Sequence, residues 1–330
     1  MVSDRAHVIM PYHIALDGAL SNHQEDLAAG STNRGIAPVY ADKMYRNGIR
    51  MIDLLEPDVF NEKLSKGYNF NKGLIENALG RSLDYTKKEI YETYIEYGKI
   101  LKPYISDVSV ELFEAYNKGK NILFEGAQGM SLDVDHGIYP YTTSSNTAAG
   151  HVSIGTGVSF KSVNRTIGVV KAYLSRVGES PLPTELKDKT ADYIRESGGE
   201  YGTTTGRPRR IGWLDLVQVR QAVRVNGLTE IALTKLDVLN NIDELMICNS
   251  YKIDDREIYE IPASLSEYRI AKPVYQKLKG WKDIPDNIWD KGFGKLPREI
   301  KEYISFIEQR VNCNVTIVSV GPQRHETIIR

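Results

Sequence analysis

The sequence predicts an α/β protein with a mostly parallel central sheet, flanking helices and a helical subdomain. Short apolar runs typical of buried strands alternate with amphipathic helical patterns through the second half of the chain. Residues 40–120 instead have helical spacing, with charged residues on alternate faces. No stretch has the composition of a flexible linker. We therefore expect residues 1–330 to form one domain that contains the 40–120 helical subdomain.

The first elements are a helix, a loop and a strand. Residues 7–20 fit a short helix, and residues 22–38, rich in serine, asparagine, glycine and threonine, fit a loop. Residues 121–124 form a brief apolar run that ends at Glu125 and Gly126. Such a run is typical of a buried strand that feeds a loop.

The later elements alternate between strands and helices. Further strands are expected at residues 165–173, 230–234, 244–249 and 315–319. Helices are expected at residues 186–197, 213–226 and 295–311. Ligands of such sheets bind outside the carboxyl ends of the strands, so we expect the chemistry in the loops there.

Composition narrows the class of protein. The 330 residues are enough for a sizeable core, and 41% of them are hydrophobic. A formal net charge of −1 argues against a nucleic-acid or membrane-surface binder, which needs a basic excess. Two cysteines make no disulfide framework, and no apolar run approaches the ~20 residues that span a bilayer. These features predict a cytoplasmic protein with reduced thiols.

Lys235 and Asp237 form a Lys-x-Asp pattern directly after the expected 230–234 strand. Guanine offers two adjacent N–H donors that match the two oxygens of a carboxylate, and a lysine stem can cover the ring. The two residues are therefore candidate guanine contacts. From the tripeptide alone, an ordinary charged surface loop is the alternative.

Residues 202–210 combine glycines and threonines with Arg207, Arg209 and Arg210. Glycines permit tight turns, threonines add donors, and arginines offer planar forks that fit carboxylates or phosphates. The segment therefore indicates an anion-binding loop, and a solvated basic loop is the alternative. The near-neutral charge of the chain argues against nucleic acid as the ligand.

Two further loops are rich in polar groups. Residues 124–147 carry many hydroxyls and amides, which can bind a neutral base or a ribose. Within them Asp133, Asp135 and His136 match no standard metal motif, so we favour a satisfied turn over a metal site. For residues 31–38, a ligand loop and a plain surface connection stay open. The sequence contains no Walker A or G-x-G-x-x-G phosphate motif.

Seven blocks, in order along the chain, closely resemble the adenylosuccinate synthetase family. They are RGIAPVYADK (34–43), FEGAQG (124–129), DVDHGIYPYTTSSNTAAG (133–150), VVKAYLSRVGESPLPTEL (169–186), GTTTGRPRRIGWLD (202–215), ALTKLDVL (232–239) and SVGPQRHETI (319–328). The resemblance runs from about residue 3 to the C-terminus.

The resemblance implies a homodimeric enzyme that joins IMP to L-aspartate with GTP and Mg²⁺ and yields adenylosuccinate. In that family GTP phosphorylates the 6-oxygen of IMP, and the aspartate amine then displaces phosphate. Phosphorylation is needed because a purine carbonyl oxygen is a poor leaving group.

The resemblance also assigns roles to individual residues. It implies IMP contacts for Thr32, Arg46, Gln128, Thr143 and Arg207. Of these, Arg46 would reach across a homodimer to the IMP phosphate of the other subunit. It implies aspartate contacts for Val177, Thr204, Thr205, Arg207 and Arg209. It implies GTP contacts for Arg209, Lys235, Asp237, Ser319, Gly321 and Pro322.

One part of the family pattern has no counterpart in the sequence. The family opens with a strand and a G-D-E-G-K-G-K loop, whose Asp is the base and a Mg²⁺ ligand. A later G-G-x-N-A-G-H-T segment supplies a catalytic His. Because neither motif occurs here, we expect the chain to begin inside the family pattern, without the family's catalytic and metal residues.

We favour the interpretation that the chain is a truncated or internally started copy of the enzyme, because the substrate loops that it contains look intact. The alternatives are one half of a split enzyme and a catalytically inactive nucleotide-binding or dimerisation subunit.

Overall fold

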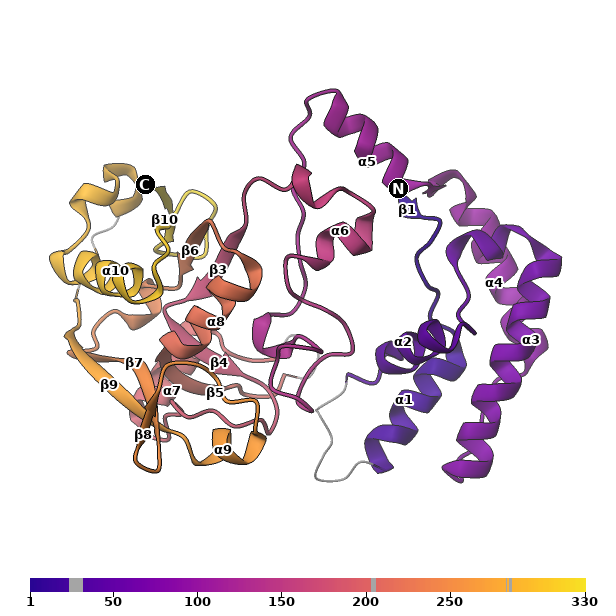
Figure 1. Cartoon of the computed structure of the whole chain (residues 1–330), viewed down its shortest axis with the longest axis horizontal. Coiled ribbons are helices and arrows are strands. Elements are labelled where there is room, and N and C mark those ends of the chain that lie inside the picture. Colours follow the sequence, from indigo (N-terminus) through magenta and orange to yellow (C-terminus); the bar gives the residue numbers. More distant parts are fainter. Residues whose placement is uncertain (24–31, 203–205, 283, 285–286) are drawn as a thin grey trace. The chain divides into compact units, whose positions relative to one another are not determined.

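The computed structural model describes residues 1–23, 32–202, 206–282, 284 and 287–330. It divides into two compact units, Met1–Ser162 (unit 1) and Val163–Arg330 (unit 2), which are coloured from indigo to magenta and from magenta to yellow in Figure 1. The expected 40–120 helical subdomain falls inside unit 1. The assignment of residues 1–330 to a single domain stays a prediction.

Unit 1 is mainly helical. Its helices are α1 (Pro11–His23), α2 (Ile36–Tyr45), α3 (Pro57–Gly73), α4 (Lys87–Leu101), α5 (Val108–Asn117) and α6 (His151–Thr156). Two short strands, β1 (Val2–Ser3) and β2 (Ile105–Ser106), pair in parallel. Helix α4 begins with a capping box, in which Thr86 and Glu89 satisfy each other's backbone N–H groups.

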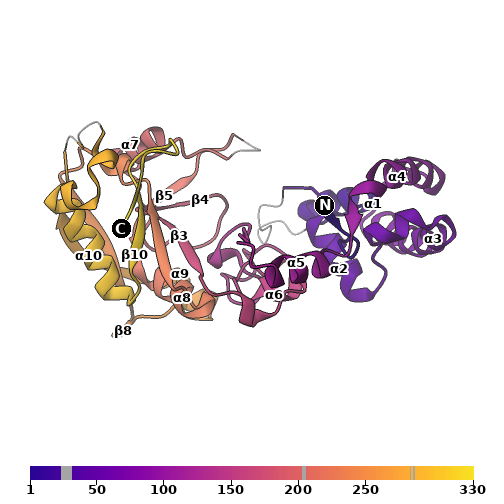
Figure 2. The ribbon, with the colours of Figure 1, turned by 90° about the horizontal axis from the view of Figure 1, so that it is seen from above.

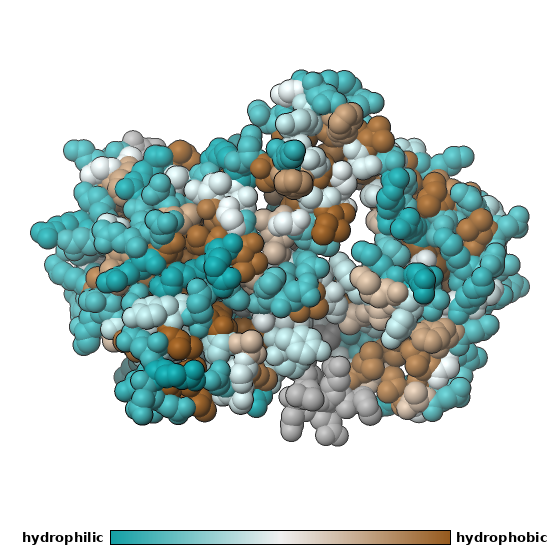
Figure 3. Space-filling view, in the orientation of Figure 1, coloured by the Kyte–Doolittle hydropathy of each residue, from teal (hydrophilic) through white to brown (hydrophobic). Residues whose placement is uncertain are grey.

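The core of unit 1 lies between α1, α3 and α4. Tyr12, Phe60, Leu64 and Ile90 from these helices are almost fully buried. On the face drawn in Figure 3, most of the visible surface of the chain is hydrophilic, and hydrophobic residues interrupt it. On α5 the apolar side chains of Val110, Phe113 and Tyr116 are exposed.

Unit 2 contains the sheets. Its strands are β3 (Ile167–Lys171), β4 (Tyr173–Arg176), β5 (Arg210–Asp215), β6 (Glu230–Thr234), β7 (Glu244–Ile253), β8 (Arg256–Ile258), β9 (Lys272–Lys279), β10 (Val315–Ser319) and β11 (Thr327–Ile329). Its helices are α7 (Lys189–Gly198), α8 (Leu216–Asn226), α9 (Leu265–Ile270) and α10 (Arg298–Val311).

The strands of unit 2 form two mixed sheets. A four-stranded sheet has the order β11-β10-β6-β3, in which β3, β6 and β10 are parallel and β11 is antiparallel. In the second sheet β5 and β7 are parallel, whereas β4, β8 and β9 pair antiparallel with their neighbours. The α/β class expected from the sequence is confirmed, with more antiparallel pairing than "mostly parallel" implies.

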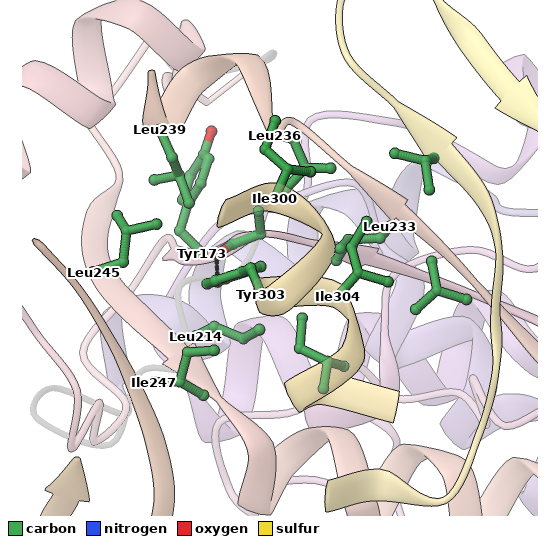
Figure 4. Packing of buried hydrophobic residues seen from close by; sticks show 14 of the residues in the cluster. Tyr173, Leu214, Leu233, Leu236, Leu239, Leu245, Ile247, Ile300, Tyr303 and Ile304 are labelled. Atoms are coloured by element: carbon green, nitrogen blue, oxygen red, sulfur yellow. Dashed lines mark hydrogen bonds between the residues drawn. The ribbon is translucent and has the colours of Figure 1, made fainter. Parts of the chain in front are cut away.

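Helix α10 covers the core of unit 2 and lies beside β10 in Figure 2. Its apolar face buries Ile300, Tyr303 and Ile304 against Leu214 of β5 and Leu233 of β6 (Figure 4). The Tyr303 hydroxyl donates to the backbone carbonyl of Ala172, at 2.6 Å. This bond ties α10 to the short break between β3 and β4.

The predicted strand at residues 121–124 is wrong, because this segment has no strand structure. The Leu123 side chain is 89% exposed. A strand needs a hydrogen-bonded neighbour, and among the described residues none pairs with this segment. Apolar composition alone therefore misled the prediction.

Other boundaries also differ from expectation. The helix predicted over 213–226 begins at Leu216, because Asp215 ends β5 and its carboxylate caps the N–H groups of Val217 and Gln218. The strand predicted over 165–173 breaks at Ala172 into β3 and β4. Helix α1 begins at Pro11, since proline suits the first turn of a helix.

Replacing Tyr303 by Phe should destabilise the protein by about 1–2 kcal/mol, because it leaves a buried carbonyl without its donor. Tyr193→Phe is the matched control. That hydroxyl also donates to a backbone carbonyl, of Asn240, but the side chain is 40% exposed. Urea unfolding measures both. Equal losses in the two variants would contradict this account of how α10 is held.

Candidate functional site

Three parallel neighbours, β3, β6 and β10, end at one edge of their sheet. Lys171 at the end of β3 lies opposite Thr234 at the end of β6, and Val318 of β10 lies opposite Leu233. The loops that follow β6 and β10 therefore leave the sheet side by side. They carry the predicted GTP contacts Lys235, Asp237, Ser319, Gly321 and Pro322.

Lys235 has a left-handed backbone, with φ of 62°. A non-glycine residue in this region costs about 1 kcal/mol, so the surrounding structure must hold it there. Its Nζ donates to the carbonyl of Gly198 at the end of α7, at 2.6 Å. Two more predicted contacts, Arg46 (67°) and Gln128 (60°), share this backbone region. Backbone strain thus coincides with predicted site residues, as is common at functional sites.

The Asp237 carboxylate is half-buried beside Lys235. Burial raises its pKa and the charge of Glu326 raises it further, whereas Lys235 opposes the shift. A partner with two N–H donors would stabilise such a half-buried carboxylate, because hydrogen bonds from these donors favour its charged form.

The loop after β10 is closed on itself. The backbone N–H of Gln323 donates to the Glu326 carboxylate at 2.6 Å, and the Ser319 hydroxyl donates to the carbonyl of Gly321 at 2.9 Å. A Cβ at Gly321 would lie 2.3 Å from a Glu326 oxygen. Only glycine therefore fits this position without displacing Glu326.

The arginine-rich segment forms a narrow hairpin. Tyr201 and Pro208 pair across it, and the N–H of Arg209 donates to the carbonyl of Glu200 at 2.9 Å. Arg207, next to Pro208 of this pair, is exposed. Two predicted aspartate contacts, Thr204 and Thr205, lie outside the described residues.

The side chain of Arg210 has a structural role, because it holds the loop that follows β4. Its guanidinium makes two bonds of 2.7 Å to the carboxylate of Glu185. It also donates to the carbonyls of Gly178 and Ser180. These bonds fix the loop after β4, which begins with the exposed Val177, another predicted aspartate contact. Arg210 thus connects the two segments that carry the predicted aspartate contacts.

A buried carboxylate at the base of the hairpin was missed by the sequence analysis. Glu200, 1% exposed, accepts hydrogen bonds of 2.7 Å from Lys171, Tyr173 and Arg209. The Nζ of Lys235 lies 4.0 Å from it. The signal that could have found this cluster is Lys171, a charge at the end of an apolar strand, together with an acid before the glycine–threonine loop. We call these five residues the Glu200 cluster.

The Glu200 cluster keeps its carboxylate charged. Burial alone would raise the pKa of Glu200, but the hydrogen bonds from Lys171 and Tyr173 and the charge of Lys171 lower it to about 2. The folded pKa is therefore below the ordinary value of 4.5. The stabilising contribution of Glu200 is complete above that ordinary value and is lost as the pH falls toward 2.

The predicted IMP contacts divide between the units. Thr32 and Arg46 flank α2, and both are exposed. Gln128 and Thr143 lie in one loop system, where the N–H of Thr143 donates to the carbonyl of Leu132. These four belong to unit 1, whereas Arg207 belongs to unit 2.

Asp133 organises the loop that carries Gln128 and Thr143. Its carboxylate is fully buried and accepts the backbone N–H groups of Asp135, His136, Thr147 and Ala148. Burial would raise its pKa, but these four donors lower it below the ordinary value. Because the oxygens are occupied, the turn interpretation fits this segment better than a metal site. Within the described residues, no three His, Cys, Asp or Glu side chains are placed to hold a metal ion.

Comparisons with known proteins decide the family. The model of the adenylosuccinate synthetase family matches residues 1–328. The chain belongs to the adenylosuccinate synthetase family. It is therefore a ligase of purine biosynthesis, from a family that uses GTP and Mg²⁺.

Individual relatives cover nearly all of this chain. The adenylosuccinate synthetase of Caldanaerobacter subterraneus subsp. tengcongensis is 47% identical over 329 residues, which are 99% of this chain and 76% of the relative. That of Ligilactobacillus salivarius is 48% identical over 326 residues, 99% of this chain and 75% of the relative. The structure of a fully ligated adenylosuccinate synthetase from Plasmodium falciparum, 35% identical, superposes with a TM-score of 0.92 over 99% of this chain and 77% of that one.

Asp133→Asn should destabilise the protein by roughly 3 kcal/mol, because an amide cannot accept all four backbone donors. The Asp133 contribution should also disappear as the pH falls through the carboxyl range, since its folded pKa is below the ordinary one. Asp135→Asn is the control, because that carboxylate accepts from the Asn146 side chain near the surface. Thermal unfolding at pH 7 and at a pH well below the ordinary value of 3.8 distinguishes them. A loss at Asp133 no larger than at Asp135 would contradict the assignment.

The strained backbone of Lys235 can be tested with glycine and alanine. Lys235→Gly should be more stable than Lys235→Ala by about 1 kcal/mol, since both lose the same side-chain bonds and only alanine keeps the strain. At Lys301 in α10 the order should reverse, because alanine favours a helix over glycine by about 1 kcal/mol. Urea unfolding of the four variants gives both differences. The same order at both positions would refute the strain.

Proposed function

We propose that this chain ligates L-aspartate to IMP in a GTP-dependent reaction that gives adenylosuccinate through 6-phosphoryl-IMP. Besides family membership, one structural observation supports the proposal. The Lys235–Asp237 loop and the Arg207–Arg209 hairpin meet at one sheet edge, around the Glu200 cluster. A guanine-binding loop that lies next to arginines able to bind carboxylates suits a reaction that needs both GTP and an amino dicarboxylic acid.

The chain's residues would bind and orient the reactants. Asp237 would accept from the guanine N–H groups, and the stem of Lys235 would cover the ring. Ser319, Gly321, Pro322 and Arg209 would complete the GTP site. Such contacts lower the entropic cost of the reaction by fixing the reacting groups.

The aspartate carboxylates would lie against Arg207 and Arg209, whose guanidinium groups offer fixed forks. Val177, Thr204 and Thr205 would add contacts to the same substrate. Thr32, Gln128, Thr143 and Arg207 would bind IMP. Holding the amine near the phosphorylated carbon then favours displacement of phosphate.

Arg46 would contact the IMP phosphate of a second subunit in a cytoplasmic homodimer. Its surroundings support a protein contact there. Arg46 is exposed at the end of α2, and the preceding Met44 and Tyr45 are 68% and 60% exposed. Exposed apolar side chains beside a charged group are typical of interfaces.

None of the described helices is long and apolar enough to cross a membrane.

Mg²⁺ would enter with the nucleotide. The described residues do not bring three metal-ligating side chains together, and the Asp133 carboxylate is occupied by backbone donors. Magnesium in nucleotide enzymes takes many of its ligands from phosphate oxygens and water, with one or two carboxylates. The roles proposed above do not depend on it.

The test is product formation by the purified chain with IMP, L-aspartate, GTP and Mg²⁺, with omission of each substrate as control. Adenylosuccinate that requires all three substrates supports the proposal. GTP binding without product would favour the non-catalytic nucleotide-binding subunit instead. Product formed without GTP would contradict the proposed 6-phosphoryl intermediate.

Asp237→Asn should reverse the nucleotide preference. An amide presents one acceptor and one donor, so it no longer matches the two N–H groups of guanine but does match the N–H and carbonyl of xanthine. GTP binding should weaken by about 1–3 kcal/mol, while XTP binding strengthens. Glu326→Gln is the control, since it changes a neighbouring carboxylate without the guanine contact. Calorimetric titration with both nucleotides measures this. An unchanged preference for GTP over XTP in Asp237→Asn would show that Asp237 does not bind guanine.

A further inference from the structure

Glu200 lies between the two loops that carry the proposed substrate contacts. Its Oε2 accepts from Arg209, at 2.7 Å. Its Oε1 accepts from Lys171 and lies 4.0 Å from Nζ of Lys235. Arg209 of the aspartate hairpin and Lys235 of the guanine loop therefore share one buried anionic partner.

The backbone fixes Glu200 as firmly as its side chain does. Its N–H donates to the carbonyl of Arg195, and its own carbonyl accepts from the N–H of Arg209, each at 2.9 Å. Gly199 before it has φ of +58°, which ends α7 with a left-handed turn. The carbonyl of Gly198 accepts from Lys235. The end of α7 thus holds Lys235 through a carbonyl and Arg209 through a carboxylate.

The space around this turn is closed. A Cβ at Gly198 would lie 2.3 Å from the Tyr173 hydroxyl, which itself donates to Glu200. A side chain at this position would push Tyr173 away from the carboxylate. The turn, the tyrosine and the carboxylate therefore form one rigid unit.

The charges of the Glu200 cluster do not balance. Lys171, Arg209 and Lys235 bring three cations to the carboxylate of Glu200, and even with Asp237 beside Lys235 the cations outnumber the carboxylates. Burial lowers the pKa of Lys171, and the charges of Arg209 and Lys235 lower it further, although Glu200 opposes this. An anionic ligand would offset the excess. Without Glu200 the three cations would repel one another, and their side chains would move apart.

We propose that Glu200 is a positioning residue, which aims Arg209 at the substrate carboxylate, holds Lys235 in the guanine loop, and thereby couples the two subsites. The ligands named here rest on the proposed function, whereas the restraint on Arg209 and Lys235 rests on this chain's contacts alone. A ligand that binds Arg209 weakens the ion pair between Arg209 and Glu200. Glu200 then interacts more strongly with Lys171 and Lys235, and this couples the two subsites.

Glu200→Gln tests the proposal, because it keeps the shape of the side chain and removes its charge. The KM values for GTP and L-aspartate should both rise by about tenfold, with a smaller change in kcat, since Glu200 touches no reacting atom. The KM for IMP should change less than either. A fall in kcat with both KM values unchanged would overturn the proposal.

Glu230→Gln is the matched control. Glu230 is also buried, makes a two-bond ion pair with Arg165 at 2.8 and 2.9 Å, and has a pKa lowered to about 2 by hydrogen bonds from Arg165 and Thr316. It begins β6, whereas Lys235 follows the end of that strand. Its loss should lower stability without raising either KM. Equal KM effects in both variants would show general destabilisation and overturn the positioning role.

A readout independent of catalysis separates this proposal from the proposed function. Amine labelling followed by mass spectrometry reports the reactivity of Lys171 and Lys235 in the whole chain. Both should react several times faster in Glu200→Gln, and neither should change in Glu230→Gln. Unchanged labelling overturns the proposal even if the chain is an active ligase. Faster labelling in a chain that makes no adenylosuccinate supports the positioning role and counts against the proposed function alone.

If Glu200→Gln does not fold, the double variant Lys171→Met with Glu200→Gln removes the buried pair together. It leaves no unpaired buried charge from that pair, so it should fold. Lys235 labelling should still accelerate in it. Labelling of Lys235 at the rate seen in Lys171→Met alone would overturn the proposal.

Discussion

The parallel alignment of β3, β6 and β10 is the constraint on which the candidate site depends. Because the three strands run in one direction in adjacent positions, their carboxyl ends and the loops that follow occupy one edge. The helices that connect parallel strands cover the faces of the sheet. The loops at the edge are free to carry charged side chains, which would be costly inside the core.

Buried carboxylates then organise these loops, and they do so in two ways. Asp133 replaces regular structure in unit 1 by accepting four backbone N–H groups, which gives an irregular loop the hydrogen bonds that a strand would otherwise supply. Glu200 in unit 2 instead holds cationic side chains at fixed positions. Both carboxylates have lowered pKa values, because donors outweigh the cost of burial.

The sequence predicted the parts of this fold that depend on local pattern. Strands at 230–234 and 315–319 are confirmed, and α10 lies within the predicted 295–311. The prediction at 121–124 was wrong because pairing partners are not visible in an apolar run. Strand β9 was missed, although exposed and half-buried residues alternate from Lys272 to Gln276, as is typical of a strand.

The residues of the candidate site likewise divide into those that the sequence identified and those that depend on the fold. Motif resemblance identified Lys235, Asp237 and the arginines, since their side-chain chemistry is visible in the sequence. The role of Glu200 was missed, because it depends on bringing together residues separated by up to 64 positions, from Lys171 to Lys235, and the charge at Lys171 is only an indirect signal of this. The left-handed backbone of Lys235 was also invisible, since lysine is not a residue that signals this conformation.

The most direct test of the account is hydrogen–deuterium exchange of the backbone amides upon addition of GTP and then L-aspartate. The account predicts that GTP slows exchange at residues 235–239 and 319–323, and that L-aspartate then slows it at 206–210. Protection confined to other parts of the chain, or no protection at saturating ligand, would contradict the claim that this sheet edge binds both substrates.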